Sequence, residues 1–188
     1  ALCYNLMLAK LIGDIGVSTF SILSFLFSLA NAVLSGAAQG LQPLWGRYYG
    51  ERDTAQMKFY FRSGILINAV LSVFIYIFLI LFDLPVIRIF NRDPALVQTA
   101  SAALPLFSLS FLPMALNLIY TAFLFSTKRT GAANAIALCR GIFLKTAAIF
   151  FLPLLFGTDA VWIAPFFAEL ITLVLSVILS KTNRLIYR

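Results

Sequence analysis

Polar residues recur at helical spacing through one of the most apolar segments of the chain. They stand every three or four positions and comprise Ser18, Ser21, Ser24, Ser28, Asn31, Ser35, Gln39, Gln42 and Gly46, a set that we call the polar stripe. At about 100° per residue, its members from Ser21 onward fall within an arc of about 80° on one helix. A helix surface in contact with lipid tails has no use for hydroxyls and amides. The stripe therefore predicts a face turned toward other helices or a water-filled cavity.

Apolar segments long enough to cross a bilayer alternate with short polar breaks along the whole chain. A helix needs about 20 predominantly apolar residues to span the hydrocarbon core. The breaks predict helices at about 1–12, 17–46, 57–82, 95–126, 132–156 and 160–180. The first segment is too short to cross, and the chain begins inside an apolar run, so we expect a fragment whose first helix is truncated. The predicted fold class is an all-α integral membrane protein, a bundle of six transmembrane helices.

Composition and charge agree with this prediction. Hydrophobic residues make up 62% of the 188 positions and charged residues only 11%, whereas about a quarter of a soluble domain is charged. The net charge of +7 is distributed over helix ends, which argues for membrane topology and against a nucleic-acid partner. Cations concentrate in 47–62, in 127–131 and in the tail (Lys181, Arg184 and Arg188), with Lys10 as the exception. By the positive-inside rule we expect these segments and the C-terminus in the cytoplasm. The expected location of the protein is the plasma membrane of a bacterium.

The sequence lacks the residues that most enzyme chemistry requires. It contains no histidine, which removes His-based metal sites, Ser-His-Asp triads and histidine proton relays. The two cysteines, Cys3 and Cys139, lie in apolar segments and are expected to be small buried hydrophobic residues. We therefore predict that the protein is not an enzyme and needs no metal or cofactor.

The cytoplasmic end of the polar stripe combines amides with residues that bend a helix or let another one approach. Pro43 removes a backbone hydrogen bond and permits a kink. Gly36 and Gly40, four residues apart, would allow close approach of another backbone, although this spacing alone is a weak signal. Gln39 and Gln42 place side-chain amides at the same end, so helix packing and cavity lining both remain open for this string.

The string at 39–50, Gln-Gly-Leu-Gln-Pro-Leu-Trp-Gly-Arg-Tyr-Tyr-Gly, resembles the eighth helix and following loop of the multidrug and toxic compound extrusion (MATE) family. Residues 7–16 are similar to the end of that family's seventh helix, and the turn at 127–131 to the one after the tenth. Arg140 stands where the eleventh helix often has an arginine, and the segment from Trp162 to Glu169 resembles the twelfth. The resemblance covers essentially the whole chain, as the C-terminal six-helix lobe.

This resemblance implies two six-helix lobes with a substrate cavity between them, driven by a proton or sodium gradient. The N-terminal lobe is then a partner missing from this chain. Some family members carry a cation site in the C-terminal lobe, but Pro113 and Met114 stand near the matching position, without a carboxylate. The chain thus resembles the DinF-like branch, in which an aspartate of the N-terminal lobe is thought to carry coupling.

Glu169 is the one carboxylate deep inside a predicted span. Three polar residues follow it on the same helix face, namely Thr172, Ser176 and Ser180, so its side chain is expected to point into the bundle. A charge at mid-bilayer is costly unless it is paired or hydrated. Arg140 and Lys145, about 13 and 20 Å into the fifth span at 1.5 Å per residue, are the expected partners. The pattern leaves open whether this charge network is structural or takes part in coupling or substrate contact.

The fourth predicted span carries two prolines, Pro105 and Pro113. Kinked helices are tolerated within a membrane where they line cavities. An aromatic such as Tyr120, beside Asn117, could hold a flat lipophilic cation by stacking or cation–π contact, with ordinary aromatic packing as the alternative. The predicted cavity wall therefore comprises Asn31, Gln39, Gln42, Asn117 and Tyr120.

Together, the residues and the resemblance imply a secondary active multidrug exporter. It would exchange drugs or toxic metabolites, lipophilic and often cationic, for H⁺ or Na⁺ by alternating access, with membrane lipid as its surroundings. A lipid-linked oligosaccharide flippase of the same superfamily is an alternative, but a cavity that holds a pyrophosphate should be strongly basic, and only Arg140 and Lys145 lie deep. A non-transporting membrane scaffold is a third possibility, which would have no need of a continuous polar stripe.

Overall fold

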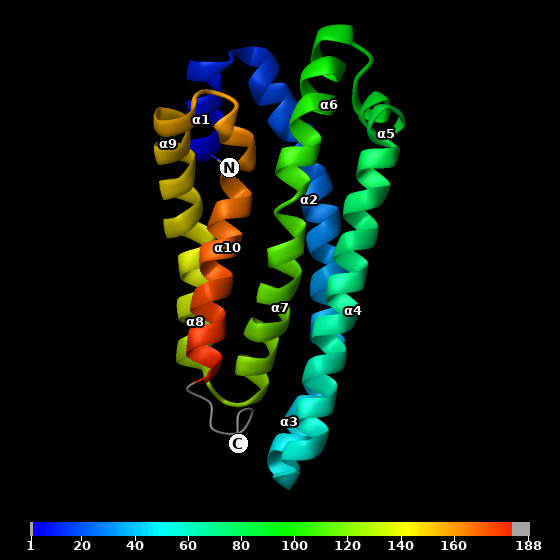
Figure 1. Cartoon of the computed structure of the whole chain (residues 1–188), viewed down its shortest axis with the longest axis vertical. Coiled ribbons are helices and arrows are strands. Elements are labelled where there is room, and N and C mark those ends of the chain that lie inside the picture. The colour runs from blue at the N-terminus through cyan, green and yellow to red at the C-terminus, as the bar shows by residue number, and fades with distance from the viewer. Residues whose placement is uncertain (1, 182–188) are drawn as a thin grey trace.

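The computed structural model describes residues 2–181, which are almost entirely helical and contain no strand. The helices in chain order are α1 (Leu2–Leu11), α2 (Asp14–Gly40), α3 (Gln42–Glu51), α4 (Thr54–Leu81), α5 (Asp83–Phe90), α6 (Pro94–Ser108), α7 (Phe111–Ser126), α8 (Thr130–Leu138), the π-helix η1 (Cys139–Phe143), α9 (Leu144–Phe156) and α10 (Ala160–Lys181). They run up and down as an elongated bundle (Figure 1).

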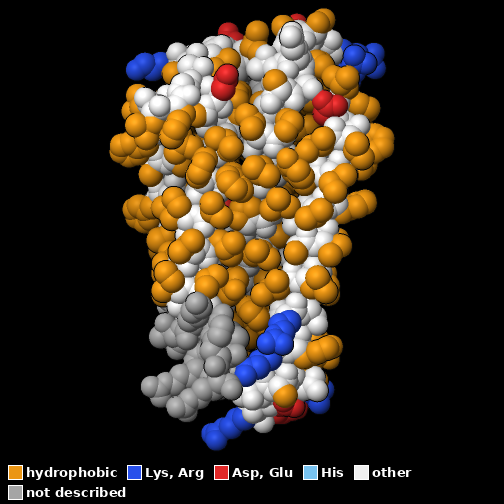
Figure 2. Space-filling view, in the orientation of Figure 1, with side chains coloured by type: hydrophobic (Ala, Val, Ile, Leu, Met, Phe, Trp, Pro, Cys, Tyr) orange, Lys and Arg blue, Asp and Glu red, His pale blue; other side chains and the backbone are white. Residues whose placement is uncertain are grey.

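Four helical segments of the described chain are long and apolar enough to cross a membrane. They are Asp14–Glu51, Thr54–Leu81, Thr130–Phe156 and Ala160–Ser180, and the bent pair Pro94–Ser108 with Phe111–Ser126 makes a fifth if it is counted as one span. Large apolar side chains cover the middle of the visible face, whereas charged ones gather at the two ends (Figure 2). The predicted all-α membrane bundle is thus the observed fold, with α1 as the short helix.

The cation-rich segments meet at one end of the bundle. The turn between α3 and α4, the turn between α7 and α8 and the end of α10 lie there, while the α1–α2 turn, α5 and the α9–α10 turn lie at the other (Figure 1). This arrangement agrees with the alternation of charge that the sequence shows. Arg184 and Arg188 lie outside the described residues, and the cytoplasmic location of this end stays a prediction.

Two of the predicted spans are interrupted along their length. Leu41 separates α2 from α3 within the second, whereas the third matches the continuous helix α4 and is followed by a short amphipathic helix, α5. α6 and α7 meet at a 41° bend. Pro113 stands in the first turn of α7 and has no N–H to donate, while the Ser110 hydroxyl donates to the Phe107 carbonyl over 2.7 Å. The predicted kink in the fourth span is therefore confirmed, and it lies between α6 and α7.

A buried amide holds three of the long helices together. Asn68 on α4 is fully buried, and its Nδ2 donates to the carbonyls of Leu34 on α2, at 3.2 Å, and Ala115 on α7, at 3.1 Å. Near it α4 passes close to its neighbours at Gly64, where a Cβ would lie 2.6 Å from Leu41 Cδ1. These contacts fix α2, which carries the polar stripe, against α4 and α7.

Candidate functional site: a buried charge network beside the polar stripe

Glu169 on α10 is the centre of a cluster of charged side chains inside the bundle. Its side chain is fully buried. One carboxylate oxygen, Oε1, lies 2.8 Å from Nε of Arg140 and 3.3 Å from Nζ of Lys145. The structure therefore brings together the three charged residues that the sequence selected, which we call the charge network, from η1, α9 and α10.

Asn117 on α7 occupies the other side of the same carboxylate. Its Nδ2 donates to Glu169 Oε2 and to the Glu169 backbone carbonyl, each over 2.9 Å. The Ser176 hydroxyl lies 3.0 Å from Asn117 Oδ1 and 2.9 Å from the Thr172 carbonyl. Both carboxylate oxygens and both amide atoms of Asn117 thus have protein partners, so α7 is fastened to α10 at this depth.

The charge network carries more positive than negative charge. Two cations share one carboxylate oxygen, which leaves a surplus of one positive charge when all three groups are ionised. Lys145 also has its ammonium 4.5 Å from the centre of the Phe27 ring on α2, a distance at which an aromatic face attracts a cation. An ion pair in a dry interior pays a large desolvation cost, and these added contacts offset part of it.

The position of Arg140 depends on a local change of helix type. η1 is a single π-turn within the fifth predicted span, and the Leu144 N–H that closes it donates to the Cys139 carbonyl. A π-turn inserts one extra residue into an α-helix and redirects the side chains around it, and such turns are frequent at functional sites. Nothing in the sequence of this span, where Gly141 is the central residue of the turn, predicted it.

Arg140 also connects the charge network to the polar stripe. Its Nη2 lies 3.4 Å from Asn31 Oδ1 on α2, at the long end of hydrogen bonding. Arg140 keeps about 15% of its side chain exposed, whereas Glu169 keeps none. The guanidinium is thus the part of the network that reaches the face on which the stripe lies.

No member of the polar stripe is buried by another helix of the described residues. The Ser21 and Ser28 side chains are exposed, and their hydroxyls donate to carbonyls of α2 itself, those of Val17 and Ser24. Ser35 does the same with the Ala32 carbonyl. Three serine hydroxyls of the stripe are thus satisfied within their own helix.

The five residues of the predicted cavity wall fall into two groups. Gln39 is exposed, and Gln42 and Asn31 are partly exposed, all on the stripe. Gln39 and Gln42 also line a groove of about 150 Å³ between α2 and α7. Asn117 and Tyr120 are buried inside the chain, the first in the charge network and the second with its ring 5.3 Å from that of Phe61. Contact between a substrate and these two residues stays a prediction.

The residues expected to kink or pack the end of α2 are exposed in this chain. Pro43 stands in the first turn of α3, directly after the break at Leu41, which is where a missing N–H is tolerated. A Cβ added at Gly36 or Gly40 would meet nothing within 4 Å. No other backbone of the described chain approaches these glycines, so the close approach predicted for them is not made among the described residues.

Sequence reasoning missed Asn68, the buried amide that joins α2, α4 and α7. Its signal was available: it is the single carboxamide side chain within α4, Thr54–Leu81, apart from Gln56 in the first turn. An isolated polar residue in an apolar span usually bonds across helices. Its partners are backbone carbonyls, however, which no pattern of side chains could have indicated.

The described residues contain no group of three or more His, Cys, Asp or Glu side chains placed to hold a metal ion. Which ion drives transport, H⁺ or Na⁺, stays a prediction that concerns the complete protein.

Comparison with known proteins identifies relatives of this arrangement. Residues 2–151 match the model of the MatE family, whereas no curated protein sequence matches the chain. An outward-facing structure of a multidrug resistance MATE family transporter of the MOP superfamily superposes with a TM-score of 0.90 at 14% identity and covers 97% of this chain. An inward-facing structure described in the same words gives a TM-score of 0.88 at 17% identity and covers 96% of this chain.

A MOP superfamily transporter from Pyrococcus furiosus, for which reversed polarity of the binding pocket is said to suggest a different function, gives a TM-score of 0.88 at 16% identity over 97% of this chain. At such identities the likeness shows the fold alone. The chain spans only 41% of the outward-facing and Pyrococcus structures and 42% of the inward-facing one. This share corresponds to one lobe of such a transporter.

Proposed function

Because the chain belongs to the MatE family, and is thereby part of a membrane transporter, we propose that it forms the C-terminal lobe of a multidrug exporter. The complete protein would export lipophilic, often cationic, small molecules in exchange for H⁺ or Na⁺. The partner lobe, absent here, would complete the cavity. The structures that the chain resembles are more than twice its length, so this activity is assigned to the whole protein.

The observation that carries the proposal is the uncovered polar stripe of α2. Three of its serines, Ser21, Ser28 and Ser35, already donate their hydroxyls to carbonyls of the same helix, and its two glutamine amides lie at the surface of the chain. Such a face is poorly suited to lipid but well suited to a wet cavity between two lobes, where a substrate passes over hydroxyls and amides without being held by any one strong contact. A scaffold protein would gain nothing from it.

We propose that the complete protein works by alternating access, in which this lobe moves as a rigid unit. The chain superposes almost equally well on an outward-facing and an inward-facing relative, with TM-scores of 0.90 and 0.88. Asn68 and the charge network both tie long helices together inside the lobe. These features support a transport cycle in which the two lobes rock against each other around the cavity.

We assign Glu169 a positioning role and not the binding of the coupling ion. Both of its carboxylate oxygens are occupied by Arg140, Lys145 and Asn117, so a coupling cation could bind there only by displacing one of them. Glu169 instead holds Arg140 where the guanidinium reaches Asn31 on the stripe. Coupling would then lie in the other lobe, as the resemblance to the DinF-like branch implies.

One observation favours a second candidate, the lipid-linked oligosaccharide flippase. The charge network has a surplus positive charge beside the stripe, and an anionic pyrophosphate is a ligand that a cationic site attracts. Against it, both deep cations already share Glu169, so little of their charge is free for a substrate. The exporter remains the better supported function.

Ethidium efflux from energised cells that express the complete transporter tests the proposal. Efflux should stop on addition of a protonophore, or on removal of sodium if Na⁺ is the coupling ion. Gln42→Ala, which changes an amide on the stripe, should weaken efflux at normal expression, whereas Gln98→Ala, an exposed glutamine on α6 away from the stripe, should not. Absence of efflux from a well-expressed parent would reject the exporter, and translocation of a lipid-linked sugar would then be the assay that tests the flippase.

A further inference from the structure

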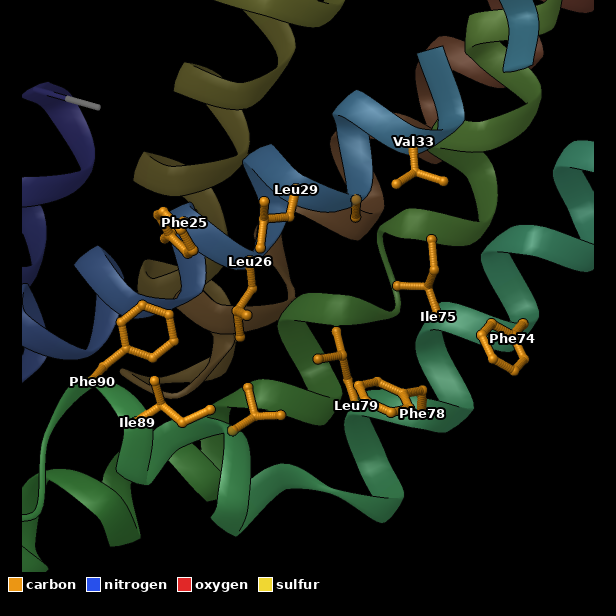
Figure 3. A pocket seen from close by; sticks show the side chains of 12 residues that line it. Phe25, Leu26, Leu29, Val33, Phe74, Ile75, Phe78, Leu79, Ile89 and Phe90 are labelled. Carbon is orange, nitrogen blue, oxygen red and sulfur yellow. The ribbon is translucent and has the colours of Figure 1, made fainter. Parts of the chain in front are cut away.

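A long apolar groove lies on the side of α2 opposite to the polar stripe. It has a volume of about 500 Å³ and is lined entirely by apolar side chains of α2, α4 and α5. Leu26, Leu29 and Val33 of α2 face Ile75, Leu79 and Ile89 across it (Figure 3). At 100° per residue, the α2 residues of the groove are centred about 150° away from the stripe. The groove is therefore separate from the proposed transport cavity.

The groove runs along α2 for several turns of the helix. On α2 its lining extends from Phe25 to Val33, which is about 12 Å at 1.5 Å per residue. Its volume falls in the range of pockets that hold small molecules, roughly 300–1,000 Å³. Since it offers no polar partner, its natural occupant is a hydrocarbon chain.

A second hollow, of about 610 Å³, adjoins the groove at the end of the bundle where α5 lies. The two share Ile89, and the second is also lined by Arg88 and Arg92. The side chain of neither arginine forms an ion pair or hydrogen bond with another described residue. Two exposed guanidinium groups thus stand at the mouth of an apolar groove, at the level where a transmembrane helix gives way to a short amphipathic one.

Two carboxylates of the same end make contacts of their own and pair with neither arginine. Asp83 accepts a hydrogen bond from the Ser101 hydroxyl. Asp93 caps the N-terminus of α6 by accepting from the N–H groups of Ala95, at 2.8 Å, and Leu96, at 3.1 Å. Arg88 and Arg92 are therefore available to an anion from outside the chain.

We propose that the groove and the two arginines form a binding site for an anionic phospholipid, with an acyl chain in the groove and the headgroup phosphate on Arg88 and Arg92. The combination matches both parts of such a lipid: hydrocarbon contacts bind the chain, and guanidinium groups bind phosphate through charge-assisted hydrogen bonds. The lipid would brace α2 against α4 and α5 from outside, on the face of α2 away from the stripe. The proposal does not depend on which substrate the transporter carries.

Native mass spectrometry of the complete transporter, purified and then exposed to defined lipids, tests the proposal. Phosphatidylglycerol should remain bound in preference to phosphatidylcholine. Replacing both arginines, in Arg88→Gln with Arg92→Gln, should lower this preference by about fivefold for each arginine. Arg47→Gln serves as a control, because Arg47 is exposed at the opposite end and paired with Glu51, and it should leave the preference unchanged.

A second pair of variants tests the apolar half of the site. Val33→Trp fills the groove from α2, whereas Val70→Trp adds the same bulk at an exposed position of α4 that does not line it. The first should abolish retention of phosphatidylglycerol and the second should not. If inorganic phosphate competes with the lipid and Val33→Trp has no effect, the site binds phosphate alone and the proposal fails. It also fails if the two lipids are retained equally, as they would be if the other lobe covered the groove.

Discussion

Two polar regions of the molecule use the same kinds of side chain in opposite ways. In the polar stripe of α2, serine hydroxyls donate to carbonyls of their own helix, and the face stays exposed. In the interior, Asn117, Glu169 and Arg140 bond from one helix to another, and the carboxylate is fully buried. The first region therefore adds little to the stability of the lobe, and the second adds much.

The difference shows how polarity within a membrane divides between function and structure. A polar group that is satisfied locally can face water and a passing substrate without constraining any neighbour. A polar group that is satisfied across helices fixes their relative positions and becomes costly to alter. Arg140 belongs to both regions, since it pairs with Glu169 and reaches Asn31 of the stripe.

The largest effect is expected from removing the carboxylate of the charge network. Glu169→Gln leaves Arg140 and Lys145 without their shared counter-charge, and breaking a buried pair in this way costs about 3–5 kcal/mol. Thermal unfolding of the purified transporter should show a large loss. Glu51→Gln is the matched control, because Glu51 accepts from Arg47 over a similar 2.9 Å but is exposed, and such pairs contribute less than about 1 kcal/mol.

Exchanging the two charges tests whether the ion pair between Arg140 and Glu169 is itself the source of stability. Arg140→Glu combined with Glu169→Arg should restore part of the expression that each single change removes, because a pair of opposite charges is re-formed at the same depth. Equal losses in the double and single variants would contradict the pairing as the source of stability.

An intermediate effect is expected at Asn117. Asn117→Ala removes two hydrogen bonds to Glu169 and one from Ser176 and leaves buried groups unpaired, at about 1–3 kcal/mol. Asn31→Ala on the stripe loses only the 3.4 Å contact with Arg140 and should leave stability nearly unchanged while altering transport. Equal destabilisation by the two changes, measured by denaturant unfolding, would remove the distinction between the regions.

Two glycine substitutions should have smaller effects on stability, and they also compare the packed interior with the exposed face of α2. Gly64→Ala places a methyl group 2.6 Å from Leu41 Cδ1, the movable end of a side chain, and should cost about 1 kcal/mol. Gly36→Ala meets nothing within 4 Å and should stabilise the helix by up to about 1 kcal/mol. If Gly36→Ala instead destabilises the complete transporter in thermal unfolding, another lobe packs closely at this end of the stripe.

The smallest effect belongs to the serines of the stripe. Ser28→Ala removes a hydroxyl that donates only to the Ser24 carbonyl, so stability should change by less than about 0.5 kcal/mol. A fall in efflux without a fall in the midpoint of unfolding is the expected result. A loss of stability comparable to that of Asn117→Ala would show that the stripe is a packing surface.

Much of this architecture could be predicted from the sequence because hydrophobicity and charge are local signals. Apolar runs located the spans, and the cost of an isolated buried charge pointed from Glu169 to Arg140 and Lys145. The π-turn η1 and the short helix α5 could not be predicted, since they depend on how neighbouring helices pack. For the same reason the pattern could not tell that Asn117 and Tyr120 are enclosed, while Gln39 is exposed.

Cysteine labelling in the complete transporter tests most directly whether the stripe lines a wet cavity. In a background without Cys3 and Cys139, Ser28→Cys, Val70→Cys and Ser176→Cys would be exposed to a membrane-impermeant maleimide. Residues 28 and 70 are both exposed in this chain, and residue 176 is buried. We expect that only Ser28→Cys reacts, and that a transported substrate slows the reaction. A Ser28→Cys side chain that stays as unreactive as Val70→Cys would contradict this expectation, because the stripe would then face lipid or dry protein.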